Sequence, residues 1–95
     1  MEDKLKTAET DTLFEAVLGL KTVEDCYDFF EDLCTVAELK AMTQRFNVAV
    51  MLSNNTVYSE IVEKTGASTA TVSRVSSALR YGHDGYKKAI EGLGK

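Results

Sequence analysis

Apolar residues recur every three or four positions along most of the chain, which is the spacing of one face of an α-helix. One such stripe follows Thr22, a second runs for more than four turns after Thr35, and a third follows Ser68. No stretch alternates with a period of two, and the chain contains no proline. The pattern therefore predicts an all-α protein without strands.

Threonines at three places carry the signals of helix N-termini. Thr12 and Thr35 are each followed three residues later by a glutamate, at Glu15 and Glu38, and Thr22 is followed by an aspartate at the same spacing. In such a capping box the hydroxyl accepts from the third helical N–H, while the carboxylate reaches back to the N–H of the cap. We therefore expect helices to begin at these threonines.

The domain organisation follows from these signals and from the lack of a long Gly/Ser linker. We expect a disordered tail over residues 1–9 and a single helical domain over 10–95. The predicted parts of the domain are helices at about 10–53, a helix-turn-helix at about 57–81 and a C-terminal helix at about 85–93.

Size and composition suggest a small cytoplasmic protein. With 95 residues, of which 44% are hydrophobic, the chain can build a modest core, and a dimer that shares its core would relieve that limit. No apolar run approaches the roughly 18 residues of a membrane span, and the N-terminus lacks the apolar segment of a signal peptide. We expect no membrane partner. Cys26 and Cys34 are expected to be buried thiols, too far apart on one helix for a disulfide.

The two parts of the chain differ in charge, although the whole chain has a net charge of -4. Residues 1–56 carry 5 Lys and Arg against 11 Asp and Glu, a net charge of -6. Residues 57–95 carry 6 against 4, a net charge of +2. Because a polyanion repels acidic surface, only the C-terminal part is suited to face nucleic acid.

Residues 57–80, "VYSEIVEKTGASTATVSRVSSALR", have the sequence form of a helix-turn-helix. Gly66 supplies the positive φ that a sharp turn between two helices requires. Ser68 is expected to cap the second helix. Val72 and Val75 continue the apolar stripe of that helix and are expected to face the first helix.

The opposite face of the second helix presents short side chains and one long cation. Short side chains let a helix lie close in the major groove, and hydroxyls can bond to phosphates or base edges. No carboxylate occurs between residues 65 and 83, so this face does not repel phosphate. The residues expected to contact DNA are Lys64, Ser68, Thr69, Ala70, Thr71, Ser73, Arg74, Ser77 and Arg80. Lys87 and Lys88, beyond the motif, are also expected to lie near phosphates.

The chain resembles a known family of DNA-binding proteins. Residues 35–93 resemble the tryptophan repressor superfamily, and the whole chain resembles its small YerC/YecD-type branch. The resemblance is carried by "TVAELKAMTQRF" on a long helix, by "TGASTATVSRVSSALR" as turn and recognition helix, and by a short final helix. It implies a six-helix subunit in an intertwined homodimer, with helices 10–53 at the dimer interface, that represses transcription from a palindromic operator in double-stranded DNA.

The resemblance also implies a candidate ligand pocket formed by Thr35, Arg45, Arg74, Val75 and Ala78. In the tryptophan repressor the amino acid lies between two arginines near a capping threonine, and Arg45, Arg74 and Thr35 match these positions. Val75 replaces a glycine, and Ala78 replaces a serine that contacts the amino group of the ligand. The branched side chain fills the space of the indole, and the lost hydroxyl leaves the ammonium without a partner. We therefore expect no response to tryptophan. Either an unidentified small-molecule effector uses the two arginines, or no effector is needed.

A second function stays open beside the DNA-binding regulator. The acidic pI of about 4.9 and the few Arg, Asn and Gln residues on the exposed face also fit a helical protein-interaction or ligand-sensing dimer that has lost DNA binding. An enzyme is not expected, because the single histidine, His83, lies in a glycine-flanked turn. Two cysteines and one histidine on separate elements make a poor zinc site, so we expect no metal and no cofactor.

Overall fold

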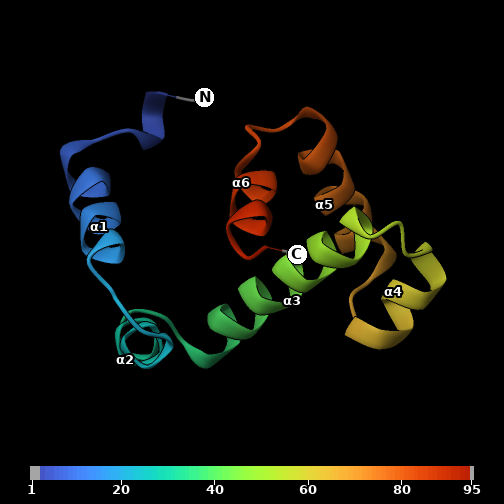
Figure 1. The fold of residues 1–95 in the computed structure, drawn as a ribbon, viewed down its shortest axis with the longest axis horizontal. Helices are drawn as coiled ribbons and strands as arrows, with labels where there is room; N and C mark the ends of the chain where they lie inside the picture. Colours follow the sequence, from blue (N-terminus) through green and yellow to red (C-terminus); the bar gives the residue numbers. More distant parts are fainter. Residues whose placement is uncertain (1–2, 95) are drawn as a thin grey trace. The chain divides into compact units, whose positions relative to one another are not determined.

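The computed structural model describes residues 3–94, which contain six α-helices, one short 3-10 helix and no strand. The all-α prediction is confirmed. Within the same residues, no helix is long and apolar enough to span a bilayer. In chain order (Figure 1) the elements are η1 (Asp3–Leu5), α1 (Ala8–Leu18), α2 (Val23–Leu33), α3 (Val36–Ser53), α4 (Tyr58–Thr65), α5 (Thr69–Tyr81) and α6 (Gly85–Gly92).

The chain divides into two compact units, Met1–Leu39 and Lys40–Lys95. The first contains η1, α1, α2 and the first turn of α3, and the second contains the rest of α3 with α4, α5 and α6. That residues 10–95 act as a single domain stays a prediction.

The N-terminal end of the described chain differs from the expected disordered tail. Residues 3–5 form η1, and α1 begins at Ala8, whereas residues 1 and 2 lie outside the described residues. The cap of α1 is Thr7, whose Oγ1 accepts from the N–H of Thr10 at 3.1 Å. The predicted cap at Thr12 is wrong: its Oγ1 donates to the carbonyl of Ala8 inside the helix, at 2.9 Å. Thr7 has no carboxylate three residues later, yet it begins the helix, so the capping-box spacing at Thr12 does not mark the start of α1.

The other two threonine caps are confirmed. Thr22 Oγ1 accepts from the N–H of Asp25 at 3.0 Å at the start of α2. Thr35 and Glu38 form the full reciprocal box at the start of α3. Thr35 Oγ1 accepts from the N–H of Glu38 at 3.0 Å, while Glu38 Oε1 accepts from the N–H of Thr35 at 2.8 Å. Two donors that a helix N-terminus leaves without a partner are thereby satisfied.

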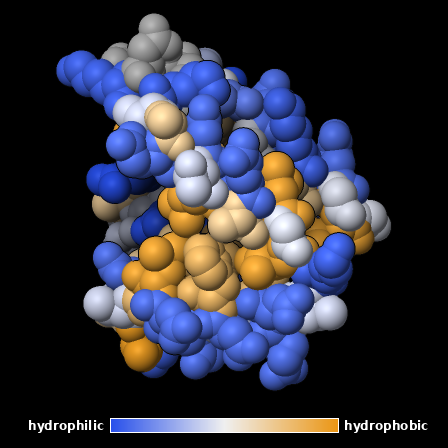
Figure 2. Space-filling model, turned by 90° about the vertical axis from the view of Figure 1, so that its left-hand side faces the viewer, coloured by the Kyte–Doolittle hydropathy of each residue, from blue (hydrophilic) through white to orange (hydrophobic). Residues whose placement is uncertain are grey.

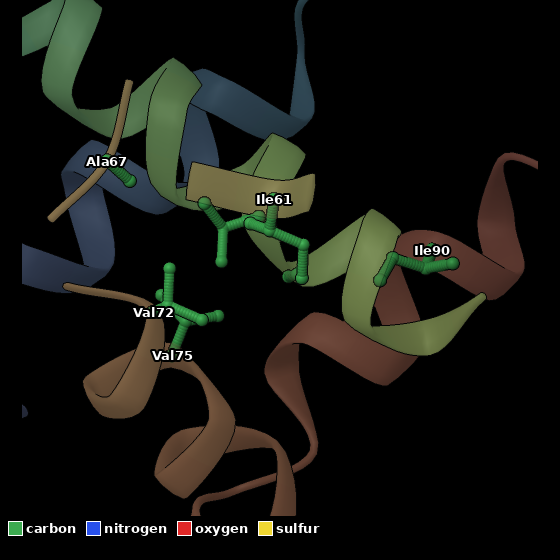
Figure 3. Close-up of a cluster of buried hydrophobic side chains, with 7 residues drawn as sticks. Ile61, Ala67, Val72, Val75 and Ile90 are labelled. Atoms are coloured by element: carbon green, nitrogen blue, oxygen red, sulfur yellow. The ribbon is translucent and has the colours of Figure 1, made fainter. Parts of the chain in front are cut away.

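The hydrophobic core of the described chain lies in the C-terminal unit. Its members come from α3, α4, α5 and α6 and from the turn between α4 and α5, and Figure 3 shows them converging. The ring centroids of Phe46 on α3 and Tyr86 on α6 lie 6.4 Å apart, so α6 also packs on α3. The buried apolar residues are Val48, Ala49, Ile61, Ala67, Val72, Val75 and Ile90.

The N-terminal unit has no comparable core. None of the residues 4–39 is buried, and Leu18 and Val23 are 84% and 74% exposed. Apolar surface is also prominent on the face of the molecule drawn in Figure 2. The prediction that the thiols are buried is wrong within this chain, because Cys26 is exposed and Cys34 is half-buried. Much of the apolar stripe on α2 stays open in this chain, with Tyr27 57% and Leu33 51% exposed.

Candidate nucleic-acid interface

The turn between α4 and α5 is held by glycine geometry and by the hydroxyl of Thr65. Gly66 has a φ of 73°, the left-handed value expected for this turn. Thr65 Oγ1 donates to the carbonyl of Ile61 at 2.7 Å and accepts from the N–H of Ala67 at 3.1 Å. Gln44 on α3 donates from Nε2 to the carbonyl of Thr65 at 3.1 Å. The turn is therefore fixed both within itself and to the long helix.

The N-terminus of α5 is capped by Ser68, as predicted. Ser68 Oγ accepts from the N–H of Thr71 at 3.1 Å and lies 3.1 Å from Thr71 Oγ1, to which it donates. Thr71 itself is half-buried. These two hydroxyls bond to each other, and Ser68 Oγ also bonds to the backbone of the first turn, which helps to fix the start of α5.

The remaining face of α5 is open to solvent. Thr69, Ala70, Ser73, Arg74 and Ser77 are all exposed on it. The opposite stripe is closed: Val72 and Val75 are 0% and 1% exposed and point toward Ile61 on α4 (Figure 3). The division of α5 into a buried and an exposed face, predicted from its spacing, is confirmed.

The cations expected near DNA differ in their surroundings. Lys64 Nζ lies 2.8 Å from Glu60 Oε2, one turn earlier on α4, and this pair partly offsets its charge. Arg74 and Arg80 are exposed, and neither forms an ion pair within residues 3–94. Arg74 and Arg80 are therefore the more available cations for a polyanion.

Both ends of the helix-turn-helix are set by backbone geometry. Gly82 ends α5, and a Cβ at this position would lie 2.4 Å from the carbonyl oxygen of Ala78. At the other end Asn55 has a φ of 62°, in the loop that leads from α3 to α4. Val57 occupies the cap position of α4, and no side chain caps this helix.

The residues of the expected ligand pocket fall in different surroundings. Thr35 belongs to the unit Met1–Leu39, where it caps α3. In the other unit Arg45 and Ala78 are half-buried and Arg74 is exposed, while Val75 is part of the core. Among residues 3–94 there is no group of three or more His, Cys, Asp or Glu side chains that could hold a metal.

Sequence reasoning missed two features of this region. One is the hydrogen bond from Gln44 to the turn, which joins residues 21 positions apart and has no local sequence signal. The other is a hollow of about 340 Å³ that borders α4, α5 and α6. Tyr58 and Lys87 are among its lining residues; Lys87 was expected near phosphates, whereas Tyr58 was not expected near DNA. Their exposure and charge give a weak signal, but their proximity depends on the fold.

The comparisons with known proteins cover nearly the whole chain. The model of the Trp repressor protein family matches residues 8–93. The chain is 49% identical over 89 residues to YerC of Bacillus subtilis (strain 168), covering 94% of this chain and 86% of YerC.

It is also 31% identical over 77 residues to the Trp operon repressor homolog of Chlamydia caviae, covering 80% of this chain and 76% of that protein. Among solved structures, a TrpR-like protein from Eubacterium eligens superposes with a TM-score of 0.94 at 53% identity, covering 98% of this chain and 96% of that one. The arrangement of six helices and the match over residues 8–93 together place this chain in the Trp repressor family, near its YerC-type members.

Proposed function

We propose that the protein is a homodimeric transcriptional repressor that recognises an operator in double-stranded DNA by inserting α5 into the major groove. The observation that carries this proposal is the exposed face of α5, which consists of short side chains and arginine. No carboxylate occurs in the sequence from residue 65 to residue 83. Membership of the Trp repressor family supports a DNA-binding regulator over an enzyme.

The chemistry of this face suits close contact with base pairs. The methyl groups of Thr69 and Ala70 can meet thymine methyls, and the hydroxyls of Ser73 and Ser77 can bond to base edges or phosphates. Arg74 can contact a phosphate or take part in an effector pocket. With so few cations we expect a shallow salt dependence, because each neutralised phosphate contributes about 0.9 to the log-log slope.

The apolar surface of the N-terminal unit supports a homodimer. Seven large apolar side chains of this unit are at least half exposed, and so much exposed apolar surface often marks a protein–protein interface. A second copy offers matching apolar faces by symmetry. The seven residues are Leu5, Phe14, Leu18, Val23, Tyr27, Leu33 and Val36.

We further propose that tryptophan is not the effector. Val75 stands at the position of the repressor's glycine, and it is 1% exposed and packed in the core. Its branched side chain therefore leaves less room for an indole ring near Arg45 and Arg74 than a glycine would. Ala78 offers no hydroxyl to an ammonium group. Calorimetric titration with tryptophan should give no heat of binding, and micromolar affinity would contradict the proposal.

A gel-shift experiment on fragments of the source genome tests the proposed function. Binding is measured at two salt concentrations, with bulk DNA as competitor. We expect a small set of fragments to stay bound when bulk DNA is in excess. If every fragment is displaced equally, specific recognition fails.

A second candidate is a helical protein-interaction or ligand-sensing dimer. It is favoured by one observation: from Thr69 to Ser77, Arg74 is the single arginine on the exposed face, and the segment contains no Asn or Gln. Replacing Thr69 and Arg74 together with alanine separates the two functions, with Lys21→Ala as a charge-loss control. Lost DNA affinity in an intact dimer supports the repressor, whereas unchanged affinity supports the interaction protein.

A further inference from the structure

A hollow of about 340 Å³ lies against the helix-turn-helix and draws its walls from four parts of the C-terminal unit. Leu52 and Leu79 are its apolar lining residues. The polar lining residues come from the end of α3 and the loop after it, from both helices of the motif and from α6; they are Ser53, Asn55, Tyr58, Ser76, Arg80 and Lys87. The lining thus combines two cations with hydroxyl and amide donors and contains no carboxylate.

We propose that this hollow holds a phosphate of the DNA backbone, and that Lys87, outside the helix-turn-helix, supplies one of its two cations. The inference rests on the proposed function. A backbone phosphate has two free oxygens that accept hydrogen bonds, and hydroxyl, amide, guanidinium and ammonium groups all donate to them. The lining residues therefore match this ligand in both charge and donor type.

The position of the hollow agrees with a DNA strand that runs along the exposed face of α5. Arg80 lies on the same side of α5 as Ser73 and Ser77, at spacings of seven and three residues. It belongs both to the exposed face of α5 and to the lining of the hollow. A strand whose bases meet Ser73 and Ser77 can therefore place a phosphate at Arg80.

The start of α4 adds to the attraction for an anion. Tyr58, the first residue of α4, lines the hollow, and no side chain caps this helix. Its first N–H groups carry partial positive charge, which favours phosphate nearby. This contribution supplements the two cations and the polar side chains.

Asp84 modulates the proposed site from its edge. Its Oδ1 lies 3.7 Å from Lys87 Nζ, and both side chains are exposed. In the free protein the carboxylate partly neutralises Lys87, and in the complex it lies near the phosphate. Asp84 therefore weakens the proposed site. Its backbone is left-handed, with a φ of 62°, so a substitution at this position must tolerate that conformation.

The neighbouring lysines offer a matched test. Lys87→Ala and Lys88→Ala remove the same charge from adjacent exposed positions, but Lys88 does not line the hollow. We expect Lys87→Ala to lower the log-log salt slope by about 0.9 per protomer and to weaken binding alike for all sequences. Lys88→Ala should change the slope by much less. Equal effects of the two variants would overturn the inference.

Two further arms complete the experiment. Asp84→Asn, which tolerates the same backbone conformation, should raise DNA affinity severalfold, and an unchanged or lower affinity would count against the site. Millimolar inorganic phosphate at constant ionic strength tests the free ion as occupant: we expect DNA binding to persist, and displacement of DNA would overturn the assignment to a backbone phosphate. If the wild-type protein binds no DNA at all, the proposed function fails together with the phosphate site. If the wild-type protein binds DNA but Lys87→Ala and Lys88→Ala behave alike, the phosphate site alone fails.

Discussion

At the residue scale, the hydroxyl of Thr65 fixes the turn between α4 and α5. Thr65 directly precedes the turn glycine, Gly66, and is half-buried. Its Oγ1 both donates to the carbonyl of Ile61 and accepts from the N–H of Ala67. One side chain thus supplies the turn with two hydrogen bonds.

Replacing Thr65 with valine tests this role. Valine has the same shape but leaves the N–H of Ala67, a buried residue, without its acceptor. We expect Thr65→Val to lower the free energy of unfolding by about 1 to 2 kcal/mol, measured by urea titration at fixed protein concentration. Thr65→Ser, which keeps the hydroxyl, should lose clearly less. Equal losses would show that the methyl group, rather than the hydroxyl, matters.

Replacing Gly66 or Gly85 with alanine should change the stability of the fold by different amounts. Gly66 has a positive φ, and a Cβ there meets no atom within 4 Å, so the cost is purely conformational. We expect Gly66→Ala to destabilise the fold by about 1 to 2 kcal/mol. Gly85 has equally open surroundings without a positive φ, so Gly85→Ala should be neutral or slightly stabilising. Thermal unfolding of both variants checks the difference.

At the element scale, α5 was predictable because its buried and exposed faces are decided within one small unit. The residues that cover its apolar stripe lie within the same motif and on the adjacent helices. The stripe on α2 was equally clear in the sequence, yet Tyr27 and Leu33 are 57% and 51% exposed. Periodicity shows which face is apolar, but it does not show whether the same chain covers that face.

Helix ends were predictable where the local signal was unique. Thr22 and Thr35 each have one suitable partner, and both cap their helices. Before α1 the capping-box spacing favoured Thr12, yet Thr7, which has no carboxylate three residues later, caps the helix. The hydrogen bond of Gln44 and the hollow beside the helix-turn-helix were beyond sequence reasoning, because both depend on how α3 and α6 pack against the motif.

A carboxylate on the exposed face of α5 should abolish recognition. Ser73 is exposed and makes a suitable position, because its replacement leaves the buried stripe intact. We expect Ser73→Glu to weaken operator binding at least about tenfold, since like charges across an interface cost several kcal/mol. Ser73→Gln has nearly the same shape without the charge and serves as the control. If both variants bind DNA like the wild type, α5 does not face the phosphates.

At the scale of the whole molecule, apolar surface is divided unequally. The described core belongs to residues 48–90, whereas the N-terminal unit leaves its large apolar side chains exposed. The chain of 95 residues therefore combines a C-terminal unit that has its own core with an N-terminal unit that we assign to dimerisation. We expect the acidic residues of 1–56, which give a net charge of -6, to disfavour contact with DNA.

The dimer should depend on the exposed apolar residues of the N-terminal unit. Leu18 is 84% exposed in the single chain. Burying an unpaired carboxylate between two copies is costly, so Leu18→Asp should shift the protein from dimer toward monomer in sedimentation at micromolar concentration. Leu18→Met, which conserves volume and polarity, should remain dimeric. A dimer that survives Leu18→Asp with unchanged affinity would place the interface elsewhere.

The central claim, that α5 reads an operator in a symmetric dimer, is tested most directly by selecting bound sequences from random double-stranded DNA. Two helices related by a two-fold axis should enter successive major grooves, whose centres lie about 34 Å or 10 base pairs apart. We therefore predict an enriched palindrome with half-sites at this spacing, which disappears when Thr69 and Arg74 are both replaced with alanine. Selection that enriches no sequence, or that enriches the same sequence with the doubly substituted protein, would contradict the account.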